Sequence, residues 1–293
     1  MILAIETSCD ETAAALLAEG RYAVAQKVAS QIPWHRPHGG VVPELAARRH
    51  METLAPLVEE VLQEAAITWG EVEAVAVTRG PGLVGSLLVG VQLAKGLALS
   101  LDRPLLGVNH LAGHLLATHL AYREKGSWVE PPLPRYPAVG LIVSGSHTDL
   151  VRIDEEEGGG PGRLTLLGST RDDAAGEAFD KAARILGLSY PGGPAIQEAA
   201  GRIEPGEPLP AFPRPLLGKG FDFSFSGLKT ALLYWWEEEG RRLGERALYR
   251  AAAGFQEAVV EVLYEKTAAA MGPPPPTLSW WRWWPTAGCG KGA

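Results

Sequence analysis

The chain has 293 residues, of which 46% are hydrophobic and 21% charged, and its mean hydropathy is zero. This composition is typical of soluble globular enzymes and excludes a disordered, collagen-like or coiled-coil protein. The length predicts two domains, each able to bury a core without metal or disulfide support. A net charge of −7 gives no overall basic field, so a nucleic acid would have to be bound on a local patch or with helper proteins.

The cysteine content and the N-terminus predict a cytoplasmic protein. With only Cys9 and Cys289, a disulfide framework is excluded and a reducing compartment is the default. The N-terminus has no basic lead-in and soon meets Asp10 and Glu11, unlike a signal peptide. The most apolar stretch, Leu83–Leu101, is interrupted by polar residues and glycines, which favours a buried helix and no membrane partner.

Strand and helix patterns alternate through the first part of the chain. The predicted strands are 3–5, 13–17, 22–28, 75–77 and 105–108, and the predicted helices are 42–63, 87–99 and 110–122. A glycine loop at 80–85 joins a strand to a helix. Residues 1–130 therefore form one α/β lobe.

A stretch rich in proline and polar residues, 124–137, is the candidate domain boundary. A second α/β lobe over 131–272 follows it. Its predicted strands are 138–143, 150–153 and 164–167, a solvated turn covers 155–162, and helices begin near Glu177, Pro194, Phe225 and Glu245, the last ending near Met271.

Two histidines, His110 and His114, stand four residues apart in a predicted helix. This spacing puts both imidazoles on one face, where they can share a divalent metal ion, although such a pair also arises by chance. The zinc-protease motif would need a glutamate where Leu111 stands, so its general base is missing.

The glycine loop Gly80–Gly85 matches a dinucleotide-binding pattern, with Asp102 about 20 residues further on. The acidic residue should end the next strand, whereas Asp102 precedes it. The pattern therefore favours a tight turn that lets a helix and a strand pack closely.

Three further segments each allow a functional and a structural interpretation. Asp10 and Glu11 lie in a turn suited to holding a metal-phosphate group or polarising water, or to capping the turn. The strand end Ile142–Thr148 can bring backbone N–H groups to an anion, or simply form a hairpin turn. Asp180 lies one turn into a helix, where it can accept ribose hydroxyls or remain an ordinary exposed acid.

Together these segments resemble the universal TsaD family of tRNA N6-adenosine threonylcarbamoyltransferases, formerly known as O-sialoglycoprotein endopeptidases. The resemblance spans roughly residues 1–270. The motifs that carry it are Ile5–Thr12, His38–Glu44, Gly80–Gly90, Asn109–His114, Val143–Thr148, Asp172–Lys181, Tyr190–Pro194 and Phe223–Lys229.

The resemblance implies an α/β fold with two ribonuclease-H-like lobes of the actin, Hsp70 and sugar-kinase type around a nucleotide cleft. The implied reaction moves the threonylcarbamoyl group from threonylcarbamoyl-AMP to N6 of the adenosine 3′ of the anticodon, in tRNAs that read codons beginning with A. The implied partners are tRNA, the shorter paralogue TsaB and the small ATPase TsaE.

The resemblance also implies roles for individual residues. His110 and His114 look like ligands of one divalent metal ion per subunit, with iron favoured over zinc. Asp10 and Glu11 are candidates for proton handling or a water-mediated metal contact. The implied substrate-binding residues are Ile142, Val143, Ser144, Gly145 and Ser146 at the nucleotide phosphates, and Asp180 and Gly193 at the nucleoside.

The chain departs from the family pattern at three places. Ser146 replaces a glycine of the phosphate loop, and His38 stands where the family has tyrosine. The segment 273–293 holds four of the nine tryptophans and has neither strand alternation nor helical period. The family continues with a strand, a nucleotide turn and an aspartate that completes the metal site, so we expect this tail to come from a shifted, truncated reading frame that impairs activity.

Three other functions remain open on the residues alone. A metallopeptidase would use the paired histidines, a kinase or ATPase would share the fold, and an inactive assembly scaffold would use helix faces over 42–63 or 110–122 as docking surfaces.

Overall fold

The computed structural model describes residues 1–272, so the hypothesis of a shifted frame over 273–293 lies outside the described part of the chain. Contacts divide the chain into two compact units, Met1–Pro134 and Arg135–Ala293. Each unit is described by itself.

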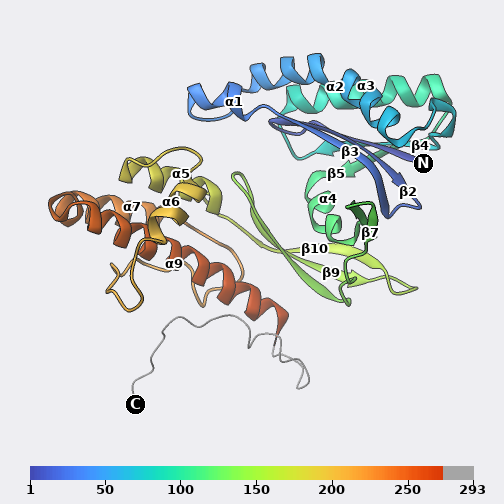
Figure 1. The fold of residues 1–293 in the computed structure, drawn as a ribbon. Helices are drawn as coiled ribbons and strands as arrows, with labels where there is room; N and C mark the ends of the chain where they lie inside the picture. The colour runs from blue at the N-terminus through green and yellow to red at the C-terminus, as the bar shows by residue number, and fades with distance from the viewer. Residues whose placement is uncertain (273–293) are drawn as a thin grey trace. The chain divides into compact units, whose positions relative to one another are not determined.

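The first unit opens with strands and closes with a short hairpin (Figure 1). Its elements are β1 (Ile2–Glu6), β2 (Glu11–Ala18), β3 (Tyr22–Ser30), α1 (Ile32–His35), a 3₁₀ turn at Arg36–His38, α2 (Pro43–Ala65), a 3₁₀ turn at Trp69–Glu71, β4 (Ala74–Gly80), α3 (Val84–Leu101), β5 (Leu105–Asn109), α4 (His110–Leu116), a 3₁₀ turn at Ala117–His119, β6 (Tyr122–Glu124) and β7 (Ser127–Val129). All five strands predicted for this lobe are present, whereas α1 and the β6–β7 hairpin are absent from the sequence prediction.

The main sheet of the first unit has the order β3-β2-β1-β4-β5. β1 pairs antiparallel with β2 and parallel with β4, while β5 continues the parallel half. α2 packs on β2 and β3, and α3 packs on β4 and α2. The alternation of buried and exposed residues along β1 and β2 supplies the apolar face that these helices cover. This is the ribonuclease-H-like arrangement that the sequence predicted.

Helix α3 corrects the expectation of a fully buried helix. Its buried residues repeat every four positions, at Ser86, Gly90, Ala94 and Ala98, so only one stripe faces the core. Val84, Leu88 and Leu99 on the same helix are exposed. By length and composition alone α3 could also cross a membrane, a test that core helices of soluble proteins pass as well.

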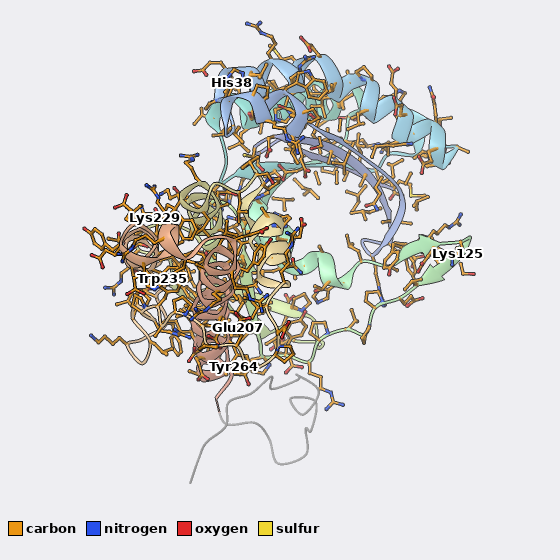
Figure 2. All side chains as sticks on the ribbon, turned by 60° about the vertical axis from the view of Figure 1, so that its left-hand side comes forward. His38, Lys125, Glu207, Lys229, Trp235 and Tyr264 are labelled. Carbon is orange, nitrogen blue, oxygen red and sulfur yellow. The ribbon has the colours of Figure 1, made fainter. Side chains whose placement is uncertain are left out.

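The predicted helix 110–122 is also corrected, because α4 ends at Leu116. Ala121 instead pairs with the start of β3 through backbone hydrogen bonds to Arg21 and Ala23. The Trp128 ring then packs edge-on against Tyr22 at 5.0 Å between centroids. These tertiary contacts draw the end of the segment into the β6–β7 hairpin, whose tip carries Lys125 (Figure 2).

The second unit begins with an antiparallel sheet of order β10-β9-β8. Its elements are β8 (Ala138–Val143), β9 (Thr148–Glu155), β10 (Pro161–Ser169), α5 (Ala175–Leu186), α6 (Gly192–Ala200), α7 (Ser226–Trp235), a π-helical turn at Trp236–Gly240, α8 (Arg241–Leu243) and α9 (Glu245–Met271). The three predicted strands and four predicted helices are all present. Each unit thus opens with an antiparallel meander followed by helices. In the described part of the second unit the sheet consists of this meander, which corresponds to the first three strands of the ribonuclease-H-like lobe that the resemblance implies.

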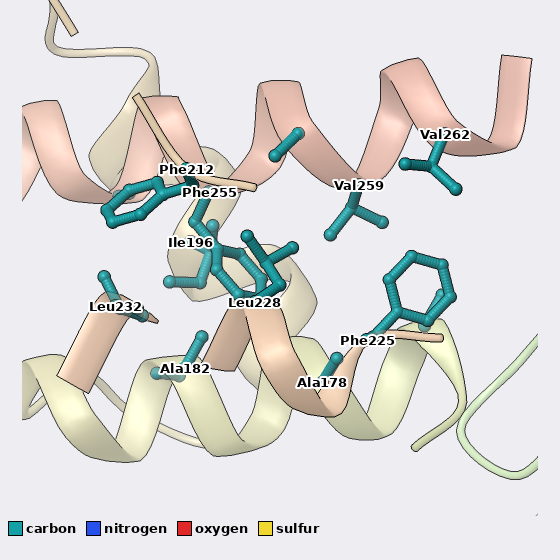
Figure 3. Packing of buried hydrophobic residues seen from close by; sticks show 14 of the residues in the cluster. Ala178, Ala182, Ile196, Phe212, Phe225, Leu228, Leu232, Phe255, Val259 and Val262 are labelled. Atoms are coloured by element: carbon teal, nitrogen blue, oxygen red, sulfur yellow. The ribbon is translucent and has the colours of Figure 1, made fainter. Parts of the chain in front are cut away.

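The core of the second unit lies between its helices. Side chains from α5, α6, α7 and α9 interlock around Ile196, Leu228 and Phe255, which are almost fully buried (Figure 3). Small residues of α5, Ala178 and Ala182, allow the neighbouring helices to approach closely. This packing makes α5 a rigid element, and α5 carries Asp180.

Candidate functional site

The paired histidines lie at the start of α4, directly after β5. The side chain of Asn109 accepts hydrogen bonds from the backbone N–H groups of Leu111 (2.9 Å) and Ala112 (3.1 Å), which caps the helix. The cap fixes His110 as the first helical residue. One turn later the Nε2 atom of His114 lies 3.1 Å from the Nε2 atom of His110. The structure therefore brings the two imidazoles together on one face.

Glu6, at the end of β1, holds His110 from the other side. One oxygen, Oε2, lies 3.0 Å from the Nδ1 atom of His110 and accepts a 2.6 Å hydrogen bond from the Thr78 hydroxyl. The other oxygen accepts the backbone N–H of Ser8. Burial by itself would raise the pKa of Glu6, but the hydrogen bonds from His110, Thr78 and Ser8 outweigh it and lower this pKa to about 2.

An ionised Glu6 determines the tautomer of His110. Because the carboxylate only accepts, Nδ1 of His110 carries the proton and Nε2 presents a lone pair on the side of His114. A carboxylate behind a metal-binding histidine is a recurring arrangement in metal sites. Sequence reasoning missed the role of Glu6, since a glutamate at the end of a strand carries no local signal for a contact with residue 110.

The two histidines fit the implied metal ion. Their Nε2 atoms are 3.1 Å apart, close enough for both to reach one ion at a metal–nitrogen distance of about 2.0–2.1 Å. Within residues 1–272 no group of three or more His, Cys, Asp or Glu side chains is arranged to hold a metal ion. The described part of the chain thus offers a pair of nitrogen ligands.

The loop between β1 and β2 contacts this pair through Ser8, whose hydroxyl lies 3.2 Å from Nδ1 of His110. Asp10 is half-buried and Glu11 is exposed at the first position of β2. Among the residues described, Ser8 is therefore the loop residue in contact with His110, and the carboxylates of Asp10 and Glu11 lie further along the same loop. Cys9 lies between Ser8 and Asp10.

The Cys9 thiol is not a nucleophile in this environment. Burial and the neighbouring Asp10 carboxylate raise the pKa of Cys9 to about 12. At neutral pH the side chain is an uncharged thiol, and both thiolate chemistry and thiolate metal ligation require the ionised form.

The glycine loop Gly80–Gly85 is a tight turn, as the sequence favoured. A Cβ atom on Gly82 would lie 2.5 Å from the carbonyl oxygen of Ser8. The backbone N–H of Leu83 donates a 2.7 Å hydrogen bond to that same carbonyl. Glycine is required because another chain segment lies against it, and that segment is the loop next to His110.

In the second unit, the segment Ile142–Ser146 ends β8 and makes the turn into β9. The Ser144 hydroxyl accepts the backbone N–H groups of Ser146 (3.3 Å) and His147 (3.0 Å), which closes a hairpin turn. The Ser144 carbonyl accepts the N–H of Gly176 at 3.0 Å, so the turn is attached to the first helical turn of α5. Ser146 does not have a positive φ, which explains why serine is tolerated in place of glycine.

Asp180 and Gly193 lie near each other on α5 and α6. The Oδ1 atom of Asp180 accepts the backbone N–H of Gly192 at 2.7 Å, and Gly193 is the second residue of α6. A Cβ atom on Gly192 would lie 2.5 Å from the Cα atom of Asp180. The substrate-binding residues implied by the resemblance are thus gathered around α5.

Asp172 organises a segment that sequence reasoning did not assign. Its carboxylate accepts the hydroxyls of Ser224 and Ser226, both at 2.6 Å, and the backbone N–H of Phe225 at 2.8 Å. Burial acts to raise the pKa of Asp172, but these hydrogen bonds prevail and lower it. Asp172 and the segment 223–229 belong to the family motifs, but no role was predicted for either from the sequence.

Comparison with known proteins decides the family. A sequence model described as "TsaD: tRNA N6-adenosine threonylcarbamoyltransferase" matches residues 23–278. The chain belongs to the TsaD family. A relative named tRNA N6-adenosine threonylcarbamoyltransferase from Symbiobacterium thermophilum is 52% identical over 267 residues, covering 91% of this chain and 73% of the relative. A relative of the same name from Thermomicrobium roseum is 50% identical over 287 residues, covering 92% of this chain and 76% of the relative.

Among solved structures, YeaZ from Pseudomonas aeruginosa aligns with a TM-score of 0.35 and 25% identity, covering 56% of this chain and 67% of that protein. Component A of the (R)-2-hydroxyglutaryl-CoA dehydratase of Acidaminococcus fermentans aligns with a TM-score of 0.49 and 13% identity, covering 94% of this chain and 80% of that protein. The TsaD-family relatives are named as transferases, and none of these findings favours the metallopeptidase, the kinase or the scaffold.

Proposed function

We propose how the residues of this TsaD-family chain carry out the reaction of the family. The enzyme is an acyltransferase that forms N6-threonylcarbamoyladenosine in tRNA, and membership of the family supports this activity. The proposal adds that the donor is threonylcarbamoyl-AMP and that the acceptor is the adenosine 3′ of the anticodon in tRNAs that read codons beginning with A.

In the first unit, His110 and His114 hold one divalent metal ion per subunit, with iron favoured over zinc. The observation that carries this proposal is the 3.1 Å approach of their Nε2 atoms, with Nδ1 of His110 held by Glu6. A bound ion would supply a Lewis acid to the carbamoyl-phosphate group of the donor. Glu6 keeps His110 in the tautomer whose Nε2 lone pair is available to that ion.

In the second unit, residues 142–146 and α5 hold the adenylate. The turn closed by Ser144 presents small residues that allow a phosphate to approach the backbone. Asp180 keeps α6 in place with one carboxylate oxygen and accepts ribose hydroxyls. Gly193, at the start of α6, leaves room for the nucleoside, and a Cβ atom there would have no neighbour within 4 Å.

Asp10 and Glu11 handle protons during the transfer. The acceptor amine forms its bond to the carbamoyl carbon as the bond from that carbon to the phosphate oxygen breaks and AMP leaves. The amine loses a proton in this step, and a carboxylate in a turn beside Ser8 can receive it directly or through water. TsaB and TsaE act with the chain, and the reaction takes place in the cytoplasm. Helper proteins agree with the negative net charge of −7, which provides no overall attraction for tRNA.

The test is a reconstituted transfer reaction. The purified chain is incubated with threonylcarbamoyl-AMP, the partner proteins and unmodified tRNA, and the modified nucleoside is measured by mass spectrometry. Because the tail at 273–293 is expected to impair activity, we expect the parent chain to form less product than a relative without this tail, and His110→Ala or His114→Ala to form none above background. The Symbiobacterium thermophilum relative serves as the positive control under the same conditions.

Two outcomes would contradict the proposal. Product formation that does not depend on either histidine would show that the reaction does not need a metal ion held by His110 and His114. No product where the relative is active, together with hydrolysis of a nucleoside triphosphate in the absence of tRNA, would favour a kinase or ATPase.

A further inference from the structure

A chain of buried polar side chains runs through the first unit behind the loop that carries Asp10. Its members are His35 on α1, His50 on α2 and Gln31 directly after β3, and each is at most 3% exposed. Neither the metal site nor the substrate residues use them. Buried polar groups must be hydrogen-bonded, so the partners of these side chains define what they do.

The hydrogen bonds follow one path through the three side chains. The backbone N–H of Val42 donates to Nδ1 of His35 at 3.2 Å, and Nε2 of His35 lies 3.2 Å from Oε1 of Gln31. Nε2 of Gln31 lies 3.4 Å from Nδ1 of His50. Nε2 of His50 lies 3.0 Å from the carbonyl oxygen of Cys9.

The two ends of this path fix the direction of every hydrogen bond. The amide of Val42 can only donate and the carbonyl of Cys9 can only accept, so both imidazoles must be neutral with the proton on Nε2. A second proton on His35 would place Nδ1–H against the Val42 N–H. Burial lowers the pKa of His50, which favours its neutral form.

The last hydrogen bond of the path is one of three that hold consecutive carbonyl groups of the loop between β1 and β2. The Ser8 carbonyl accepts from the N–H of Leu83 at 2.7 Å, and the Asp10 carbonyl accepts from the N–H of Gln31 at 2.9 Å. Between them, the Cys9 carbonyl accepts from His50. Two of these hydrogen bonds come from backbone N–H groups, which every residue except proline supplies, whereas the third depends on one histidine.

We propose that His50, oriented by His35 through Gln31, is a positioning residue that holds the loop carrying Ser8 and Asp10 in its active geometry. The inference rests on the proposed function of that loop. The Thr12 hydroxyl, 2.7 Å from Nδ1 of His50, supports the same ring orientation from β2. Releasing the Cys9 carbonyl frees the two peptide groups between Ser8 and Asp10, and small displacements of reacting groups reduce turnover strongly.

Two substitutions at His50 separate positioning from packing. The amide nitrogen of glutamine reaches about as far as imidazole Nε2, whereas that of asparagine reaches only as far as Nδ1. His50→Gln therefore keeps a donor to Cys9, and His50→Asn loses it while leaving a polar group beside Thr12. Both replace a fully buried ring with a smaller amide and should lower thermal stability, and His50→Asn should lower it further because the Cys9 carbonyl loses its donor.

We expect His50→Asn to lower kcat in the transfer reaction about tenfold or more, with KM for tRNA unchanged, and His50→Gln to retain most of the parent's kcat. The assay is run well below the melting temperatures of both variants, so that both are folded. Equal losses of kcat in both variants, or no loss in either, would overturn the proposal.

Long-range proton–nitrogen spectra of the histidine-labelled protein test the path without activity. Signals of His35 and His50 are assigned by their disappearance in His35→Gln and His50→Gln. We expect both rings to be neutral with the proton on Nε2, and a charged ring or an Nδ1–H tautomer at either position would overturn the proposal. If Asp10→Asn retains full kcat while these spectra agree, the proposed role of Asp10 fails and the hydrogen-bonded path stands.

Discussion

Glu6 orients His110 by accepting its Nδ1 proton, and this decides which ring nitrogen a metal ion can use. Replacing Glu6 by glutamine removes the ionised acceptor of the Nδ1 proton. It also introduces an NH₂ group that can donate to Nδ1 of His110 and so favour the other tautomer of the ring. We expect Glu6→Gln to weaken the binding of Zn²⁺ or Fe²⁺ by about 10–100-fold in a competition titration. Glu19→Gln, at an exposed turn of the same unit, is the control and should bind as the parent does.

The same carboxylate makes the stability of the protein depend on pH. Hydrogen bonds lower the pKa of Glu6 in the folded chain from about 4.5 to about 2. Its stabilising contribution is therefore complete above pH 4.5 and is lost as the pH falls towards 2. The difference in free energy of unfolding between the parent and Glu6→Gln, measured by urea denaturation, should shrink between pH 6 and pH 3. A difference that stays constant over this range would contradict the lowered pKa.

The histidine pair could be predicted from sequence because both members lie on one short helix, where spacing determines the face. Glu6 and Thr78 could not be predicted, since they approach His110 only once β1, β4 and β5 lie side by side. His50 is similar, because its partner Cys9 is more than forty residues away. Contacts of this kind depend on strand order, which local patterns do not encode.

At the scale of elements, two of the three glycines of α3, Gly90 and Gly96, lie in opposite surroundings. A Cβ atom on Gly90 would press on the buried Thr7 side chain, whereas one on Gly96 would meet nothing within 4 Å. We expect Gly90→Ala to destabilise the protein by about 1–3 kcal/mol through overpacking. Gly96→Ala should stabilise it by about 0.5–1 kcal/mol, because alanine favours a helix.

Thermal and urea unfolding of both variants check this pair. The changes in the free energy of unfolding should have opposite signs. A stabilising Gly90→Ala would contradict the expected overpacking and would show that the loop containing Thr7 moves to make room for the added methyl group. The comparison is well matched because both positions lie in the interior of the same helix.

The elements themselves were largely predictable, and the errors have a common cause. The periodicity of 110–122 is helical throughout, yet α4 stops at Leu116 because Ala121 pairs with β3. Likewise the proline-rich stretch 124–137 indicated a linker but contains β7 of the hairpin. In both cases backbone hydrogen bonding prevailed over local preference: Ala121 pairs with the distant β3, and β7 pairs with its neighbour β6.

At the scale of the whole molecule, Glu6, Ser8 and Thr78, which surround His110, belong to the first unit, and this unit has its own hydrophobic core. We expect the fragment 1–134 to fold alone and to bind Zn²⁺ with the affinity of the full chain. Circular dichroism and a competition titration check this. Binding about tenfold tighter in the full chain would show that residues beyond 134 supply a further ligand.

Helix α5 lies between two contacts that leave no room for a side chain, Gly176 against the Ser144 carbonyl and Gly192 against Asp180. Backbone therefore contacts backbone at both positions, and these contacts fix the distance from the turn at Ser144 to the start of α6. Mutation of surface side chains cannot lengthen it. If residues 142–146 and α5 hold the adenylate as proposed, a ligand with a longer or shorter bridge between its base and its phosphate would require an insertion or deletion in α5. Ligand length would then be specified by the number of residues rather than by their identity.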